Sequence, residues 1–252
     1  MKKIFYIYLL ILSLSSISLA STRADVKIIE TSENIRYLSQ KIVKNYLYLY
    51  RHPQKIEIKK EIEKELNQLG DYFNNISNIV KDDDTKGIIE FLHYTKEQIL
   101  EIVQNIPNKE DVLLMLDYSE IILEGTDTIA NIYKYDFIDE EKMIMTTKSI
   151  EYLLERTIKY YMAFKMDFNK DMNKESMYIA INSLEEDFAK IESYSYPDIQ
   201  KKKRQNIMNL WKRNRMFINK GEKIFIPNLL IPSISNLEYA VKDISLYHIK
   251  NQ

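Results

Sequence analysis

The sequence predicts an all-α protein made of two tandem four-helix up-and-down bundle modules. Apolar residues return three or four positions apart along almost the whole chain, which is the spacing of an amphipathic helix. Only 4 of the 252 residues are glycine and 5 are proline, a composition that disfavours a turn-rich β fold. A segment near the start also recurs 115 positions later. Together these observations indicate two related helical modules.

The internal repeat defines the two modules. Residues 35–47 return in altered form as residues 150–162, so that Tyr37 aligns with Tyr152 and Tyr46 with Tyr161. Because the period is far longer than the 20–50 residues of solenoid arrays, each copy is predicted to be a small domain, residues 21–137 and 138–252. The same offset aligns Leu38 with Leu153, Lys41 with Arg156, Lys44 with Lys159, Leu69 with Leu184, Phe73 with Phe188 and Ile76 with Ile191.

Residues 1–20 have the pattern of a secretory signal peptide. A short positive start is followed by an apolar run over residues 4–14 and by the small residues Ser18 and Ala20, which predicts cleavage before Ser21. The alternative is an uncleaved membrane anchor, but the apolar run is shorter than the ~20 residues that cross a bilayer. Later apolar runs are broken by charged residues. We therefore expect a soluble periplasmic protein.

Helix boundaries in the first copy are marked by proline and by capping residues. Ile35, Leu38 and Ile42 follow the three-four alternation of a bundle helix. Breaks at residues 52–53, 82–85, 106–108 and 135–136 each offer a proline stop, or an Asp, Thr or Asn that can cap the next helix. Four helices are predicted for this copy.

In the second copy, breaks near Asp171, residues 196–198 and residues 221–222 again predict four helices. Pro227 and Pro232 interrupt the expected last helix, so that helix should begin late or kink. If residues 113–120 match residues 229–236, Ser119 aligns with Ser235.

Composition excludes several classes of function. With no cysteine, stability must come from burial of apolar surface and not from disulfides. The balance of 36 basic and 37 acidic residues does not suggest a nucleic-acid partner. The basic run at residues 201–204 is best interpreted as a solvated helix face.

The sequence offers no catalytic, metal or cofactor site. Glu90 and His93 form one Glu-x-x-His pair, but a di-metal bundle needs two such pairs and two further glutamates. Three histidines and no cysteine leave neither a zinc constellation nor a cysteine nucleophile. Trp211 is expected to pack between helices. The protein is therefore predicted not to be an enzyme.

One segment carries candidate binding residues. Arg36, Ser39 and Gln40 lie within one helical turn, so a guanidinium, a hydroxyl and an amide could converge on a small oxyanion. Lys41, which follows directly, is the fourth candidate binding residue. The alternative is an exposed helix face that binds nothing. The second copy would lack the site, because it carries different side chains at the aligned positions: Glu151, Leu154, Glu155 and Arg156.

Residues 35–44, Ile-Arg-Tyr-Leu-Ser-Gln-Lys-Ile-Val-Lys, resemble the Arg-x-Leu-Ser-Gln-Arg-x-x-Lys opening helix of the PilJ-type sensor domain. That domain forms the N-terminal part of type IV pili methyl-accepting chemotaxis transducers and is related to the periplasmic domain of nitrate-sensing histidine kinases. Trp211, Ser119 and Ser235 are similar to the tryptophan and serine of its later helices. Tandem copies occur in the family.

The resemblance implies a periplasmic sensor or ligand-binding protein that recognises a small anion or metabolite and passes its state to a membrane-bound chemoreceptor or histidine kinase. It also implies a homodimer through the first helix, with Arg36 contacting the anion across the seam. Two alternatives remain open. Glu33 could instead pair with Arg36 in a structural salt bridge. The whole protein could be a scaffolding or interaction bundle without a ligand.

Overall fold

The computed structural model describes the backbone of residues 2–251 and the side chains of residues 24–251. This part of the chain contains eight α-helices and no strand, which confirms the all-α prediction. Each predicted break lies at or next to a helix boundary. The helices are α1 (Lys2–Arg51), α2 (Ile56–Ser77), α3 (Asp83–Gln104), α4 (Lys109–Ile132), α5 (Asp139–Lys165), α6 (Lys170–Ser193), α7 (Asp198–Gly221) and α8 (Pro227–Asn251).

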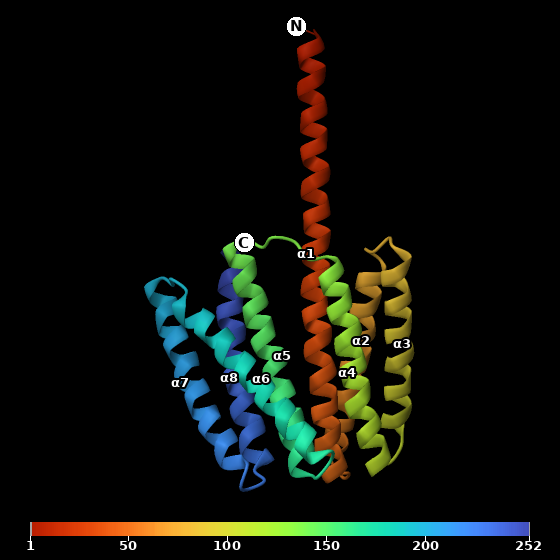
Figure 1. Cartoon of the computed structure of the whole chain (residues 1–252), viewed down its shortest axis with the longest axis vertical. Helices are drawn as coiled ribbons and strands as arrows, with labels where there is room; N and C mark the ends of the chain where they lie inside the picture. The colour runs from red at the N-terminus through yellow and green to blue at the C-terminus, as the bar shows by residue number, and fades with distance from the viewer. Residues whose placement is uncertain (1, 252) are drawn as a thin grey trace.

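Helix α1 is much longer than the others, and its first part projects beyond the remaining seven helices (Figure 1). Met1 and the side chains of the predicted signal peptide lie outside the described residues. Between residues 24 and 251, none of the helices has a stretch both long and apolar enough to cross a bilayer.

Helices α1 and α5 lie in the middle of the molecule, with α2, α3 and α4 on one side and α6, α7 and α8 on the other (Figure 1). Helix α1 packs against α2, α4 and α5, while α5 packs against α1, α6 and α8. Helix α3 contacts α2 and α4, and α7 contacts mainly α8. The two groups of four thus share one pattern of neighbours, as the repeat predicts. Their division into separate domains at residue 138 stays a prediction.

The predicted capping residues begin two helices of the first group. The Asp82 carboxylate accepts a hydrogen bond from the Thr85 backbone N–H at 2.7 Å, before α3. The Asn108 side chain accepts one from the Asp111 backbone N–H at 2.9 Å, before α4. Each cap satisfies one of the N–H groups that a helix start leaves unpaired, typically worth about 1 kcal/mol.

Burial agrees with the repeat register in the first two helices of each group. Ile35 and Ile150 are fully buried, as are Tyr46 and Tyr161. Other aligned apolar pairs are also buried: Leu38 with Leu153, Leu69 with Leu184, Phe73 with Phe188 and Ile76 with Ile191. Equivalent positions therefore occupy equivalent places in the two cores.

The last helices follow a different register. Helix α8 begins 118 positions after α4, three more than the repeat offset, so the predicted late start is confirmed. Pro227 is its first residue, where a missing N–H carries no penalty. The alignment of Ser119 with Ser235 is wrong, because Ser119 is fully buried and Ser235 is exposed. In the observed register Glu120 aligns with Glu238.

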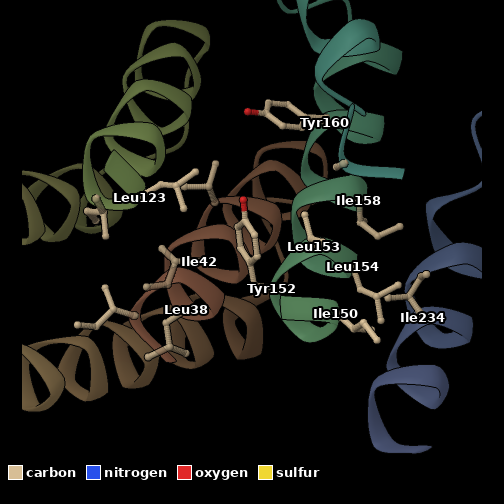
Figure 2. Close-up of a cluster of buried hydrophobic side chains, with 14 of the residues drawn as sticks. Leu38, Ile42, Leu123, Ile150, Tyr152, Leu153, Leu154, Ile158, Tyr160 and Ile234 are labelled. Carbon is tan, nitrogen blue, oxygen red and sulfur yellow. The ribbon is translucent and has the colours of Figure 1, made fainter. Parts of the chain in front are cut away.

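The contact between α1 and α5 forms the centre of the core (Figure 2). Leu38 and Ile42 of α1 lie near Tyr152 and Leu153 of α5, and all four are buried. Each aliphatic side chain buried in this way stabilises the fold by about 1.5–3 kcal/mol. From Ile28 to Leu49 nearly every side chain of α1 is at least partly covered, including polar ones. The centre of the protein therefore contains polar groups that must find partners inside it.

Candidate functional site

Arg36, the main predicted binding residue, is held by two carboxylates. Its Nη1 lies 2.6 Å from Glu33 Oε1, and its Nε lies 3.0 Å from Asp127 Oδ1 of α4. The guanidinium also lies over the Tyr152 ring of α5, 4.5 Å from its centroid. Burial alone would lower the pKa of Arg36, but the two carboxylates outweigh it and raise that pKa. The structure thus contains the predicted Glu33 salt bridge, and two nitrogens of the guanidinium face carboxylates of the protein itself.

The other three predicted residues have partners of their own. Ser39 Oγ donates to the Arg36 carbonyl at 2.8 Å. Gln40 Nε2 donates to Ser39 Oγ at 3.1 Å. Lys41 Nζ points to α2, 2.7 Å from Glu65 Oε1. The four side chains therefore do not converge on one point, and an anion site at Arg36 stays a prediction without support from this geometry.

The α1 face that carries Arg36 is covered within the chain. Helix α5 packs on this part of α1 and brings Tyr152 against Arg36. The second copy of the repeat thus occupies the place in which the resemblance predicts a symmetry mate. The homodimer through the first helix stays a prediction, and in it α5 would have to be displaced for two Arg36 side chains to meet.

A buried ionic cluster joins α5 to α4. Lys159 of α5 is fully buried, and its Nζ bonds to Ser119 Oγ at 2.9 Å and to the Glu120 carboxylate. Arg156 Nη2 bonds to the other oxygen of Glu120 at 2.8 Å. Burial lowers the pKa of Lys159 to about 8, whereas for Glu120 the two cations outweigh burial and lower the pKa. Each charge in this cluster has a partner of opposite sign.

The repeat places an equivalent cluster between α1 and α8, but one residue differs. Lys44 aligns with Lys159, and Glu238 aligns with Glu120. Where the first cluster has Gln40 of α1, the second has Glu155 of α5. Glu155 forms an ion pair with Lys44. Lys44 Nζ lies 2.9 Å from Glu155 Oε1 and 2.8 Å from Glu155 Oε2. The second cluster thus has one lysine, Lys44, for two glutamates. Lys44 pairs with Glu155, and Glu238 has no ion-pair partner among the described residues.

Glu238 is a buried carboxyl group without a partner among the described side chains. It is 6% exposed, its Oε1 receives no hydrogen bond, and it forms no ion pair in the part of the chain that the structure describes. Burial, reinforced by the charge of Glu155, raises the pKa of Glu238 well above its ordinary value, although Lys44 and Lys242 oppose this. A buried unpaired carboxyl group is costly unless it is protonated or binds a cation.

Glu238 lines a cavity of about 750 Å³ between α1, α2, α5 and α8. This volume lies within the range of about 300–1,000 Å³ that is common for small-molecule sites. Two lysines on its walls pair with carboxylates: Lys41 with Glu65 at 2.7 Å, and Lys242 with Glu151 at 3.8 Å. A third, Lys55, lies over the Tyr48 ring, 5.3 Å from its centroid, and forms no ion pair within residues 24–251. The aromatic rings on its walls belong to Tyr37, Tyr48, His52 and Tyr239.

Two of these tyrosines are held in place by neighbours. The Tyr48 hydroxyl donates to Asn228 Oδ1 at 3.1 Å and so joins α1 to the start of α8. The Lys242 ammonium lies 5.1 Å from the centroid of the Tyr37 ring. Tyr239 is exposed at the mouth of the cavity. The cavity thus combines fixed aromatic faces with one unpaired buried acid, and we treat it as the candidate ligand site.

Sequence reasoning missed Glu155 and Glu238 as site residues. A signal for Glu155 was present in the repeat. At the offset of 115, a glutamate replaces Gln40 four positions before the aligned pair Lys44 and Lys159. No comparable signal existed for Glu238, because the register of the fourth helix changes by three residues. Only the packing of α8 against α5, which in turn packs on α1, brings Glu238 close enough to Lys44 for their charges to interact.

No group of three or more His, Asp or Glu side chains within residues 24–251 is arranged to hold a metal ion.

Comparison with protein-family models, with curated proteins and with solved structures gives no match to this chain. The PilJ-type resemblance therefore stays a prediction that rests on its motif.

Proposed function

We propose that this protein is a non-enzymatic small-molecule-binding bundle whose ligand occupies the cavity between α1, α2, α5 and α8. The observation that carries the proposal is Glu238, a buried carboxyl group with no partner that lines a cavity of ligand size. Buried polar groups normally have partners, and an exception calls for an explanation such as an absent ligand. The periplasmic sensor role, with a membrane-bound chemoreceptor or histidine kinase as partner, belongs to this proposal.

The chemistry of the cavity favours a small organic amine, with or without a carboxylate of its own. An ammonium group in the cavity can replace the proton on the Glu238 carboxyl group and form a charge-assisted hydrogen bond with it. The aromatic walls already attract cations, since the ammonium groups of Lys242 and Lys55 lie 5.1 Å and 5.3 Å from the centroids of the Tyr37 and Tyr48 rings. Lys44 pairs with Glu155 at 2.8 Å and Lys242 with Glu151 at 3.8 Å, so neither forms an ion pair with Glu238. The proposed ligand is therefore a cation, whereas the ligand predicted at Arg36 is an anion.

Isothermal titration calorimetry with four matched probes tests the proposal: butylamine, butanol, butyrate and the zwitterion norvaline. An ammonium-bearing probe should bind, and butanol and butyrate should not. Because the ammonium displaces a proton from Glu238, the measured enthalpy should change with the ionisation enthalpy of the buffer.

Two substitutions locate the site. Glu238→Gln keeps the shape and removes the charge, so it should weaken ammonium binding roughly 10- to 100-fold, which corresponds to the 1.5–3 kcal/mol of a charge-assisted hydrogen bond. Glu61→Gln, on the rim of the same cavity, should leave the affinity nearly unchanged. Equal affinities of all four probes, or equal losses in the two variants, would contradict the assignment.

A scaffolding bundle without a ligand is the second candidate function. The observation that favours it is the internal ion pairing of Arg36 with Glu33 and Asp127, and of Lys159 with Glu120, which uses these charges inside the protein. If none of the four probes binds and none raises the melting temperature, this second function becomes the better one.

A further inference from the structure

A second surface of the molecule lies far from the candidate ligand site. Helices α3 and α4 enclose a mainly apolar groove of about 640 Å³, with Ile88, Phe91 and Ile121 on its walls. Phe91 is 54% exposed. Gly87 leaves the groove open, since a Cβ added there would meet no atom within 4 Å. The carboxylates of Asp83, Asp84 and Glu124 line its rim.

The outer face of α4 continues this acidic character. Glu110, Asp117 and Glu124 are exposed, lie seven residues apart and form no ion pair among the described side chains. Seven residues are two helical turns, so their side chains project from one face at intervals of about 10.5 Å. Leu114 and Ile121 lie between them on the same face. The whole helix carries six acidic residues and one basic residue.

Helix α7, at the opposite edge of the molecule, has the complementary character (Figure 1). It carries eight basic residues and one acidic residue. Lys202, Arg213 and Lys220 are exposed along one outer face and form no ion pair within residues 24–251. Met216, 49% exposed, lies between the last two. Arg213 and Lys220 are seven residues apart, which matches the spacing of Asp117 and Glu124.

We propose that α7 of one copy docks in the α3–α4 groove of a second copy, with Met216 against the apolar walls and Arg213 and Lys220 beside the acidic rim. Matched charge spacing and an apolar residue between the charges favour this occupant over an unrelated partner. The two surfaces lie at opposite edges of one copy (Figure 1), so the contact is head-to-tail and can be repeated along a row of molecules.

Sedimentation velocity of the full chain at low and high salt tests the proposal. The wild type should associate at about 10 mM salt, where charges act over ~30 Å, and should dissociate at about 1 M salt, where they act over ~3 Å. The α7-reversed variant (Lys202→Glu, Arg213→Glu and Lys220→Glu) should be monomeric at both. The α4-reversed variant (Glu110→Lys, Asp117→Lys and Glu124→Lys) should be monomeric as well.

The decisive sample combines both sets of reversals in one chain, because both faces then change sign and attract again. This combined variant should regain at least tenfold in self-affinity over either parent. A control with the same charge change elsewhere, Lys60→Glu, Lys64→Glu and Lys134→Glu, should associate like the wild type.

Three results would overturn the inference: a wild type that is monomeric at low salt, association that survives reversal of α7, or a combined variant that stays monomeric. A monomeric wild type that sediments with phosphatidylglycerol vesicles through α7 would assign this helix to an anionic membrane instead.

Discussion

Replacing the unpaired Glu238 by glutamine should stabilise the protein at neutral pH, although the residue is almost fully buried. Glutamine has nearly the same shape but carries no charge, so the unfavourable burial of a carboxylate beside Glu155 disappears. An unsatisfied buried polar group costs about 1–3 kcal/mol. For a protein of this size, the melting temperature should rise by about 2–4 °C for each kcal/mol.

The effect should depend on pH in a defined direction. The pKa of Glu238 is raised in the folded state, so the folded protein holds this proton more tightly than the unfolded chain does. The contribution of the group to stability is then complete below the unfolded pKa of about 4.3 and is lost as pH rises through the folded pKa. Glu238→Gln should therefore gain most at pH 8 and little at pH 4.

The equivalent glutamate of the other cluster supplies a matched control with the opposite sign. Glu120 neutralises the fully buried Lys159 and also pairs with Arg156 at 2.8 Å. Glu120→Gln leaves the buried Lys159 without its counter-charge, so it should destabilise the protein by about 1–3 kcal/mol, since the Glu120 side chain itself is 39% exposed. Urea unfolding followed by circular dichroism measures both variants. A destabilised Glu238→Gln, or a stability gain that is equal at pH 4 and pH 8, would refute the reasoning.

Two further perturbations test the remaining polar groups. Arg36→Ala should cost about 1–3 kcal/mol in urea unfolding, because it leaves the buried Glu33 carboxylate unpaired; a loss near zero would mean that the salt bridge is not formed. His248 is fully buried with its Nδ1 unpartnered, and burial lowers its pKa, so the unfolded chain binds a proton first as pH falls below about 6.5. Stability should drop between pH 7.5 and pH 5, and His248→Gln should flatten that part of the profile; equal slopes in variant and wild type would contradict this role.

The fold class and the helix boundaries followed from the sequence because they depend on local chemistry. Helical periodicity, a proline at residue 53, and capping by Asp82 and Asn108 act within a few residues of each boundary. The repeat also predicted which apolar positions are equivalent, and Tyr46 and Tyr161 are both buried as expected. The Glu33 salt bridge with Arg36 could be anticipated as well, since the two lie one turn apart on one helix.

The partners of the buried charges could not be predicted, because they join helices far apart in the chain. Lys44 meets Glu155 across 111 positions, a contact that exists only because α1 and α5 pack side by side. Arg36 is exposed in a helix considered alone, yet α4 and α5 cover it with Asp127 and Tyr152. The sequence alone thus determined which segments are helices and which positions repeat. Only the tertiary structure decided which charges are neutralised and which carboxyl group remains unpaired, because that outcome depends on the packing of four helices around two central ones.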